Sequence, residues 1–167
     1  MRLTRRHMIA SGLAGTMLGT PALARTPMEI GWEDLIPPGV PYAEIIGEGE
    51  LDEANDTWSP IFDANATKLN EKLDGALVRI PGFILPLEIG TAGVTDFILV
   101  PYIGACIHTP PPPPNQLVLA HAETPWPSDQ LWDAVWAIGM MRTRLQSTEL
   151  AQTGYSLSVE SMEVYEW

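Results

Sequence analysis

Apolar and polar residues alternate along much of the second half of the chain, and this alternation predicts β-strands. The clearest case is the segment 77–87, where Val78, Ile80 and Ile84 alternate with residues of other types. Pro81-Gly82 lies in the middle of this segment, so the predicted strand is long and bent instead of flat. Three further strands are predicted, at 95–106 with an interruption at Pro101, at 116–122 and at 155–165.

The segment 131–141 has two interpretations. Trp132 and Trp136 are four residues apart, as on one face of a helix, whereas the β-branched residues and the interior glycine of the segment suit a strand. We favour the strand. The preceding segment 123–130 is predicted to be a loop, and 142–153 is predicted to be helical or turn-like.

Five strands, with a bent first strand and a long connection before the last, predict a mainly β protein built on a small, bent five-stranded barrel. The oligonucleotide/oligosaccharide-binding (OB) fold is the natural candidate for such a barrel. That fold usually places a helix between its third and fourth strands. The segment 123–130 has room for a turn at most, so we expect an OB-like barrel without this helix.

The segment 25–73 is predicted to be an extended, irregular arm that lies over the barrel domain, 74–167. Prolines and acidic residues interrupt the arm every few residues, which disfavours long regular elements. Its tryptophans and isoleucines make it too apolar for a disordered tail. A short helix is predicted between Asn65 and Leu73, with Asn65 or Thr67 as its N-cap.

The first 24 residues have the features of a cleavable export signal. Arg5-Arg6 precede a mildly apolar run, which ends in the small residues of Ala22-Leu23-Ala24. The paired arginines favour the twin-arginine route, which carries folded proteins. We expect cleavage near Ala24 and a free periplasmic protein, because the start of the mature chain has no cysteine to take a lipid anchor.

The charge of the chain argues against nucleic acid as a partner. The chain carries 21 acidic residues against 9 lysines and arginines, a formal net charge of −12. The predicted leader holds three of the arginines, so the mature chain would keep 9 − 3 = 6 basic residues and a net charge of 6 − 21 = −15. Affinity for phosphate groups depends on clustered lysine and arginine, so an anionic membrane surface is disfavoured as well.

The only cysteine lies in an uncommon block, Gly104-Ala105-Cys106-Ile107-His108-Thr109, directly before five prolines. On a strand, Cys106 and His108 would point to the same face. Thiolate and imidazole are ligands of Zn²⁺ or Cu(I), and His121 is the other histidine outside the leader, so these three residues form a candidate zinc site. In a simple strand pairing His121 would lie roughly 10 Å away, so a closed site needs a bulge, a carboxylate or a second copy of the chain.

Two other interpretations of Cys106 remain open. In the first, Cys106 is a buried, inert thiol that supports the start of the proline segment. In the second, Cys106 is a nucleophile that His108 activates, as in thiol enzymes. The enzyme interpretation is the least favoured, because no orienting acid or glycine-rich oxyanion loop is visible beside the pair. The sequence therefore favours a non-enzymatic protein and assigns no catalytic residue.

The five consecutive prolines are a candidate interaction element. They lack backbone donors and fix φ, so they predict a polyproline II rod of about 15 Å, at roughly 3.1 Å per residue. A partner protein can dock such a rod at low ordering cost, and the alternative is a rod packed on its own domain. The residues predicted to contact a partner are Tyr102, Pro110, Pro111, Pro112, Pro113, Pro114, Asn115 and Gln116.

Residues 77–88 and the block from Val100 to Gln116 resemble the signature of a family of small exported bacterial proteins, known mainly as domains of unknown function. The ending 155–165 fits this family too, so the resemblance covers roughly 74–167. Many members of that family lie beside ABC-transport genes, some of them in zinc-responsive groups. The resemblance implies a periplasmic accessory protein with a transporter protein of the periplasm or inner membrane as its partner, and a link to zinc.

Overall fold

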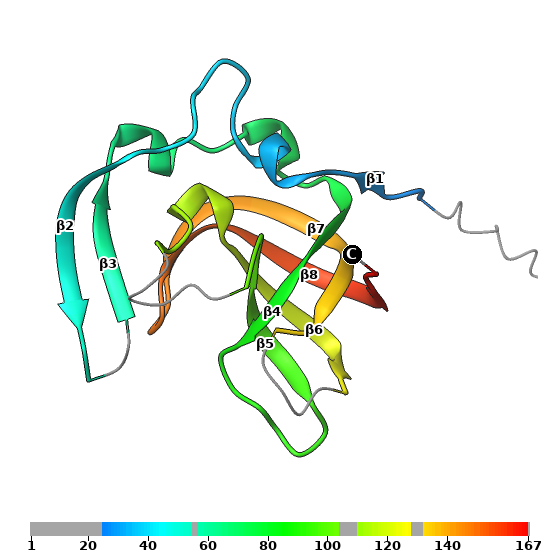
Figure 1. Cartoon of the computed structure of the whole chain (residues 1–167). Helices are drawn as coiled ribbons and strands as arrows, with labels where there is room; N and C mark the ends of the chain where they lie inside the picture. Colours follow the sequence, from blue (N-terminus) through cyan, green and yellow to red (C-terminus); the bar gives the residue numbers. More distant parts are fainter. Residues whose placement is uncertain (1–24, 55–56, 104–109, 128–131, 167) are drawn as a thin grey trace, which may run out of the picture.

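A computed structural model describes residues 25–54, 57–103, 110–127 and 132–166. Within these ranges the chain is mainly β-structure (Figure 1). The strands are β1 (Met28–Glu29), β2 (Ile45–Asp52), β3 (Thr57–Phe62), β4 (Leu77–Pro86), β5 (Val94–Val100), β6 (Val118–Trp126), β7 (Ala134–Ser147) and β8 (Gln152–Val164). Four short 3-10 turns are η1 (Trp32–Leu35), η2 (Ala64–Thr67), η3 (Glu71–Leu73) and η4 (Pro114–Gln116). No helix in the described ranges is long and apolar enough to cross a membrane.

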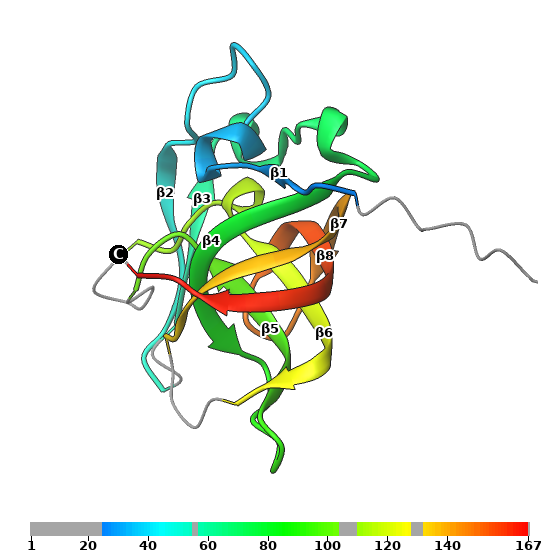
Figure 2. The same ribbon diagram turned by 90° about the vertical axis from the view of Figure 1, so that its right-hand side faces the viewer.

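Five of the strands close into a barrel. Their order is β4-β5-β6-β8-β7, and β7 pairs back with β4. The pairings are antiparallel except that of β6 with β8, which run parallel. Figure 2 shows β7 and β8 wrapping across one side of this barrel. The predicted OB-like, five-stranded barrel is confirmed, and β1 adds a short extra strand along β4.

The bend predicted at Pro81-Gly82 allows β4 to pair with two different strands. Residues 77–83 pair with β7, whereas 83–86 pair with β5. A Cβ atom at Gly82 would lie 2.8 Å from Leu99 Cγ and 2.9 Å from Trp32 Cζ2, so only glycine fits between these side chains. The indole Nε1 of Trp32 also donates a hydrogen bond to the carbonyl of Pro81 at 2.8 Å. The bend thus closes the barrel and positions the first tryptophan of the arm.

The core of the barrel includes side chains from the arm. Ile80, Phe97 and Leu157 fill the interior, and Leu35 of η1 and Leu73 of η3 belong to the same buried cluster. Complete burial of a leucine side chain contributes about 1.5–3 kcal/mol. The arm is therefore part of the folded core and not a loose covering.

Two sequence predictions for the barrel are wrong. The predicted loop at 123–130 is a continuation of β6 as far as Trp126, and the predicted helical or turn-like segment 142–153 continues β7 as far as Ser147. A partner strand decides each case, because Val94 of β5 pairs with Trp126 and β8 pairs with β7 from Val135 to Ser147, and local propensity does not show these cross-strand contacts. The favoured strand at 131–141 is confirmed from Ala134 onward.

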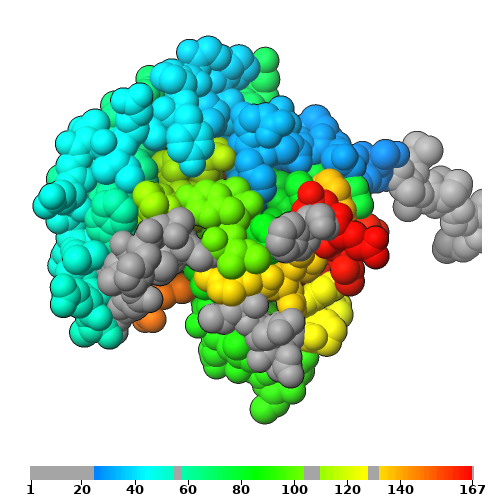
Figure 3. All heavy atoms as spheres, viewed as in Figure 1, coloured from blue at the N-terminus to red at the C-terminus, as the bar shows by residue number. Residues whose placement is uncertain are grey.

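The arm contains more regular structure than predicted. Strands β2 and β3 form an antiparallel hairpin separate from the barrel sheet, and this hairpin stands along one side of the molecule (Figure 3). The short helix expected at 65–73 is instead two 3-10 turns. Asp63 caps η2 by accepting from the backbone N–H of Asn65 at 2.9 Å, and Asn70 caps η3. Neither Asn65 nor Thr67 is the N-cap.

Tyr155 on β8 links the barrel to two separate places in the arm. Its side chain is fully buried. The hydroxyl accepts a hydrogen bond from the backbone N–H of Asn70 at 2.6 Å and donates one to the carbonyl of Leu35. Burial raises the pKa of Tyr155 to about 12. A single hydroxyl therefore provides a hydrogen-bond partner for the backbone both at the end of η1 and at the start of η3.

Replacement of Tyr155 by phenylalanine should lower the free energy of unfolding by about 1–3 kcal/mol, because it leaves buried backbone groups without a partner. Urea unfolding measures this loss. Tyr165→Phe is the matched control: the ring of Tyr165 packs edge-on against Trp136 with centroids 5.1 Å apart, and removal of its hydroxyl should change stability by less than about 0.5 kcal/mol. Equal losses in the two variants would contradict the role of the Tyr155 hydroxyl.

Candidate functional site

The predicted metal ligands are only partly within the described residues. Cys106 and His108 fall in the range 104–109, which lies outside them. His121 lies exposed on β6, and its Nδ1 is 2.7 Å from Oδ1 of Asp96 on the neighbouring strand β5. In the part of the chain that the structure describes, no three His, Cys, Asp or Glu side chains are grouped so that they could hold a metal ion.

The contact between His121 and Asp96 orients the imidazole ring. The hydrogen bond from His121 is the main cause of a lowered pKa of the Asp96 carboxyl, and a hydrogen bond from the Thr95 hydroxyl lowers this pKa further. An ionised carboxylate only accepts hydrogen bonds, so Nδ1 of His121 is the donor. In the neutral ring, Nε2 is then the nitrogen with a free lone pair.

The proline segment packs on the barrel and does not stand free. Pro112 and Pro113 are buried, whereas Pro110 is exposed. The backbone of Pro113 has φ −66° and ψ 159°, which is the polyproline II region. The Tyr102 hydroxyl donates to the carbonyl of Pro110 at 2.8 Å, and Pro114 begins η4. The sequence leaves two interpretations open, a rod that a partner docks and a rod that packs on its own domain. The second describes this segment, although part of its surface lines a groove.

Asn115 and Gln116, which the sequence predicts as partner contacts, are buried and bind the chain's own arm. The Nδ2 group of Asn115 donates to the carbonyl of Asn65 at 2.9 Å and to that of Lys68 at 3.1 Å. The Nε2 group of Gln116 donates to the carbonyl of Trp32 at 2.9 Å. These two side chains therefore fasten η1 and η2 to the end of the proline segment.

A glycine allows the same segment to approach β8. A Cβ atom at Gly154 would lie 2.6 Å from Leu69 Cδ2 and 2.8 Å from the carbonyl oxygen of Pro114. The backbone N–H of Gly154 donates to the carbonyl of Leu117 at 3.3 Å. The arm, η4 and the barrel thus meet at one tightly packed point.

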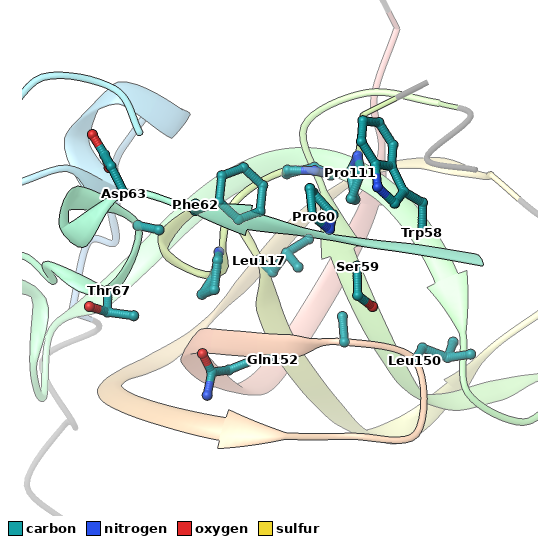
Figure 4. Close-up of a pocket in the computed structure, with 14 residues that line it drawn as sticks. Trp58, Ser59, Pro60, Phe62, Asp63, Thr67, Pro111, Leu117, Leu150 and Gln152 are labelled. Carbon is teal, nitrogen blue, oxygen red and sulfur yellow. The ribbon is translucent and has the colours of Figure 1, made fainter. Parts of the chain in front are cut away.

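A groove of about 340 Å³ lies beside this point, between the β2–β3 hairpin and the barrel (Figure 4). Strand β3 contributes Trp58 and Phe62, the proline segment contributes Pro111, and the turn between β7 and β8 contributes Leu150. The indole Nε1 of Trp58 donates to the carbonyl of Glu48 at 2.6 Å, which holds the ring on the hairpin. The other lining residues are Ser59, Pro60, Asp63, Ala66, Thr67, Pro112, Pro114, Leu117, Ala151 and Gln152.

The chemistry of the groove is that of a binding site for apolar groups. Its walls are mostly prolines, aliphatic side chains and two aromatic rings, and the lining formed by the described residues contains no histidine or cysteine. Proline rings offer apolar surface without a backbone N–H, so they favour apolar side chains from a ligand. The few polar groups at its wall, such as Gln152 and Asp63, can fix the orientation of what binds.

Sequence reasoning missed the hairpin side of this groove. Trp58, Pro60 and Phe62 occupy every second position of β3, and this period of two is the signal of a strand that presents them on one face. The proline within the run concealed this signal, because a proline argues against a central strand but is tolerated at an edge.

A family model described as "Protein of unknown function (DUF3299)" matches residues 32–164. The chain belongs to the DUF3299 family. It is similar to the crystal structure of a DUF3299 family protein from Pseudomonas aeruginosa PAO1, with 36% sequence identity, a TM-score of 0.69, and coverage of 86% of this chain and 99% of that chain. A comparison with curated proteins finds no match. The groove, the five barrel strands and the arm from Trp32 onward lie within the matched residues.

Proposed function

We propose that this DUF3299 protein is an exported, periplasmic accessory protein that works by binding another protein in the groove between the β2–β3 hairpin and the proline segment. The proposal rests on one observation, the apolar residues that form the two walls of the groove. Pro111 forms part of one wall and Trp58 and Phe62 form part of the other, so apolar surface is presented in a concave site. Such sites bind by burying apolar groups, at about 25 cal/mol for each Å² removed from water.

The walls of the groove are held in place before any partner binds. Pro112 and Pro113 are buried, and Asn115 and Gln116, which follow Pro114, are tied to the arm. The Trp58 ring is fixed by its bond to the hairpin backbone. Preorganised walls favour affinity, because little conformational entropy is lost when the partner binds.

The proposed site of action and the proposed class of partner rest on the sequence and on the family resemblance. The leader at 1–24 supports twin-arginine export, and the family match begins downstream of it. The strongly acidic chain disfavours nucleic acid and anionic membranes. The transport-gene neighbourhood implied by the resemblance makes a transporter protein of the periplasm or inner membrane the proposed partner.

In-cell photo-cross-linking tests this function directly. With a photoreactive phenylalanine derivative in place of Trp58 or Leu150, irradiation should give a discrete adduct of higher mass that is recovered in the periplasmic or the inner-membrane fraction. The same derivative in place of Glu88, on the exposed connection between β4 and β5, is the matched control and should give no such adduct. Absence of an adduct from both groove positions, in variants that fold, would refute the proposed site.

A zinc-linked function is the second candidate, and the pair of His121 and Asp96 favours it. Histidines that bind zinc usually donate their other ring N–H to a carboxylate, a backbone carbonyl or water, which fixes the ring and raises its basicity. His121 has this arrangement through Nδ1, at 2.7 Å from Asp96. Because the described residues do not supply three ligands, the site would also require Cys106 and His108.

Elemental analysis of protein purified without chelator should then find zinc at up to one equivalent. The metal should be lost in Cys106→Ser or His108→Ala and bound less tightly in His121→Ala, and Asp96→Asn should weaken it by about 10–100-fold because the His121 ring loses its orienting partner. Glu88→Gln is the matched control for the removal of an exposed carboxylate. If the wild-type protein carries no zinc and added Zn²⁺ does not protect Cys106 from alkylation, the zinc function is excluded.

A further inference from the structure

The wall of the barrel opens where strands β6 and β8 separate. The two strands pair in parallel as far as Ala122 and Val159, and in the described part of the chain no pairing between them follows. Beyond this point β6 turns to β5, where Trp126 pairs with Val94, whereas β8 stays on β7. Figure 2 shows the ends of β6 and β8 well apart. The backbone of the barrel therefore leaves a gap at this end.

A pocket of about 310 Å³ lies in this gap. Trp126 of β6 and Met162 of β8 line the pocket, and both side chains also pack against the buried cluster of the barrel core. The other lining residues are Ala122, Thr124, Pro125, Pro127, Val159, Glu160 and Ser161. None of these residues lines the groove beside the proline segment, so the inference drawn from the pocket does not depend on the proposed function.

Glu160 gives the pocket a negative charge that the described residues do not neutralise. Its side chain is exposed, and no lysine or arginine is among the described residues of the lining. The arginines that form salt bridges in the described ranges do so with Glu29, Glu163 and Asp74. A carboxylate in this situation attracts a cationic ligand and repels an anionic one.

The donors that an anion would need are few among the described residues of the lining. Pro125 and Pro127 have no backbone N–H. The indole Nε1 of Trp126 donates to Oδ2 of Asp133 at 3.1 Å, so the donor of this ring is engaged and the ring is held in place. The ring contributes its π-system, which attracts cations, and the flexible thioether of Met162 packs well around alkyl groups.

We infer that this pocket binds a small organic cation, an alkylammonium ion whose charged group meets Glu160 and the Trp126 ring while its alkyl chain contacts Met162. The hydroxyls of Thr124 and Ser161 are further acceptors for the ammonium N–H groups. The volume lies at the lower end of the range for small-molecule sites, roughly 300–1,000 Å³, so the occupant is a free small molecule and not a segment of a partner protein.

The probe is n-pentylammonium, with 1-pentanol and pentanoate as the neutral and the anionic compounds of matched length. Each compound is titrated into the isotope-labelled full chain at low salt, and NMR follows the indole N–H of Trp126 and the methyl group of Met162. We expect saturable shifts at both groups, with pentylammonium bound most tightly and pentanoate least tightly, because only the ammonium is opposite in charge to Glu160. Added salt should bring the affinity of pentylammonium closer to that of pentanol.

Two variants separate the contributions of the carboxylate and of the ring. Glu160→Gln should weaken the binding of pentylammonium by about fivefold and leave that of pentanol unchanged, because the variant keeps the shape and removes the charge. Glu50→Gln, which removes an exposed carboxylate from the β2–β3 hairpin, is the matched control and should change both affinities by less than about twofold. Trp126→Leu should weaken pentylammonium more than pentanol, since it removes the aromatic ring.

Equal affinity for the three compounds, shifts centred away from the pocket, or undiminished binding in a Glu160→Gln variant that keeps the wild-type melting temperature would each overturn the inference. N-acetyl-lysine methylamide carries the same ammonium group on a peptide backbone, so it distinguishes a free amine from a lysine side chain of a partner protein. We expect it to bind more weakly than pentylammonium, because a pocket of about 310 Å³ must also accommodate its backbone. Binding as tight as that of pentylammonium, or tighter, would show a protein side chain as the occupant and would contradict the inference as well.

Discussion

Two adjacent buried amides, Asn115 and Gln116, hold the molecule together at the point where its three parts meet. They donate to the arm at Trp32, Asn65 and Lys68, and they lie at the end of the proline segment just before β6. A buried polar group that loses its partner costs about 1–3 kcal/mol. Displacement of the arm would take both acceptors from the Asn115 amide and one of two acceptors from the Gln116 amide, so the arm has one favoured position on the barrel.

Both walls of the groove begin at this anchor. On one side, Pro111 to Pro114 lead directly into Asn115. On the other side, strand β3 ends at Phe62, Asp63 caps η2, and the carbonyl of Asn65 accepts from the Asn115 side chain. The hydrogen bonds of Asn115 therefore fix the distance between the hairpin and the proline segment. They do so at points only a few residues away from each wall of the groove. The shape of the groove therefore depends on the hydrogen bonds of Asn115, a residue outside its lining.

The barrel was more predictable from the sequence than the site was. Alternation around Val78 and Ile80, with the bend at Pro81-Gly82, identified β4 and the barrel, because a buried face imposes a period of two wherever a strand lies. The extension of β7 to Ser147 could not be predicted from local preference, because its pairing with β8 decides it. The β2–β3 hairpin was concealed by Pro60 and by the acidic residues that make the arm look irregular.

For the site, the sequence draws attention to the proline segment but does not show which residues of the block face outward. Asn115 and Gln116 look like exposed recognition residues beside five prolines, and their burial follows only from the return of the arm, which is distant in sequence. The opposite wall, Trp58 and Phe62, required knowledge of where the hairpin lies. Contacts between distant segments therefore define the groove, and local patterns show only its pieces.

Native-state hydrogen exchange of the full chain is the most direct test of the anchor. The account predicts that the amides of Lys68 and Leu73, which bond to the carbonyls of Asn65 and Asn70, open with the same free energy as the barrel amide of Met141, which bonds to Ala76. Asn115→Ala should lower the opening free energy at Lys68 more than at Met141. Rapid exchange at Lys68 and Leu73 in the wild-type protein, or an equal loss at all three amides in the variant, would contradict the claim that the buried amides hold the arm in place.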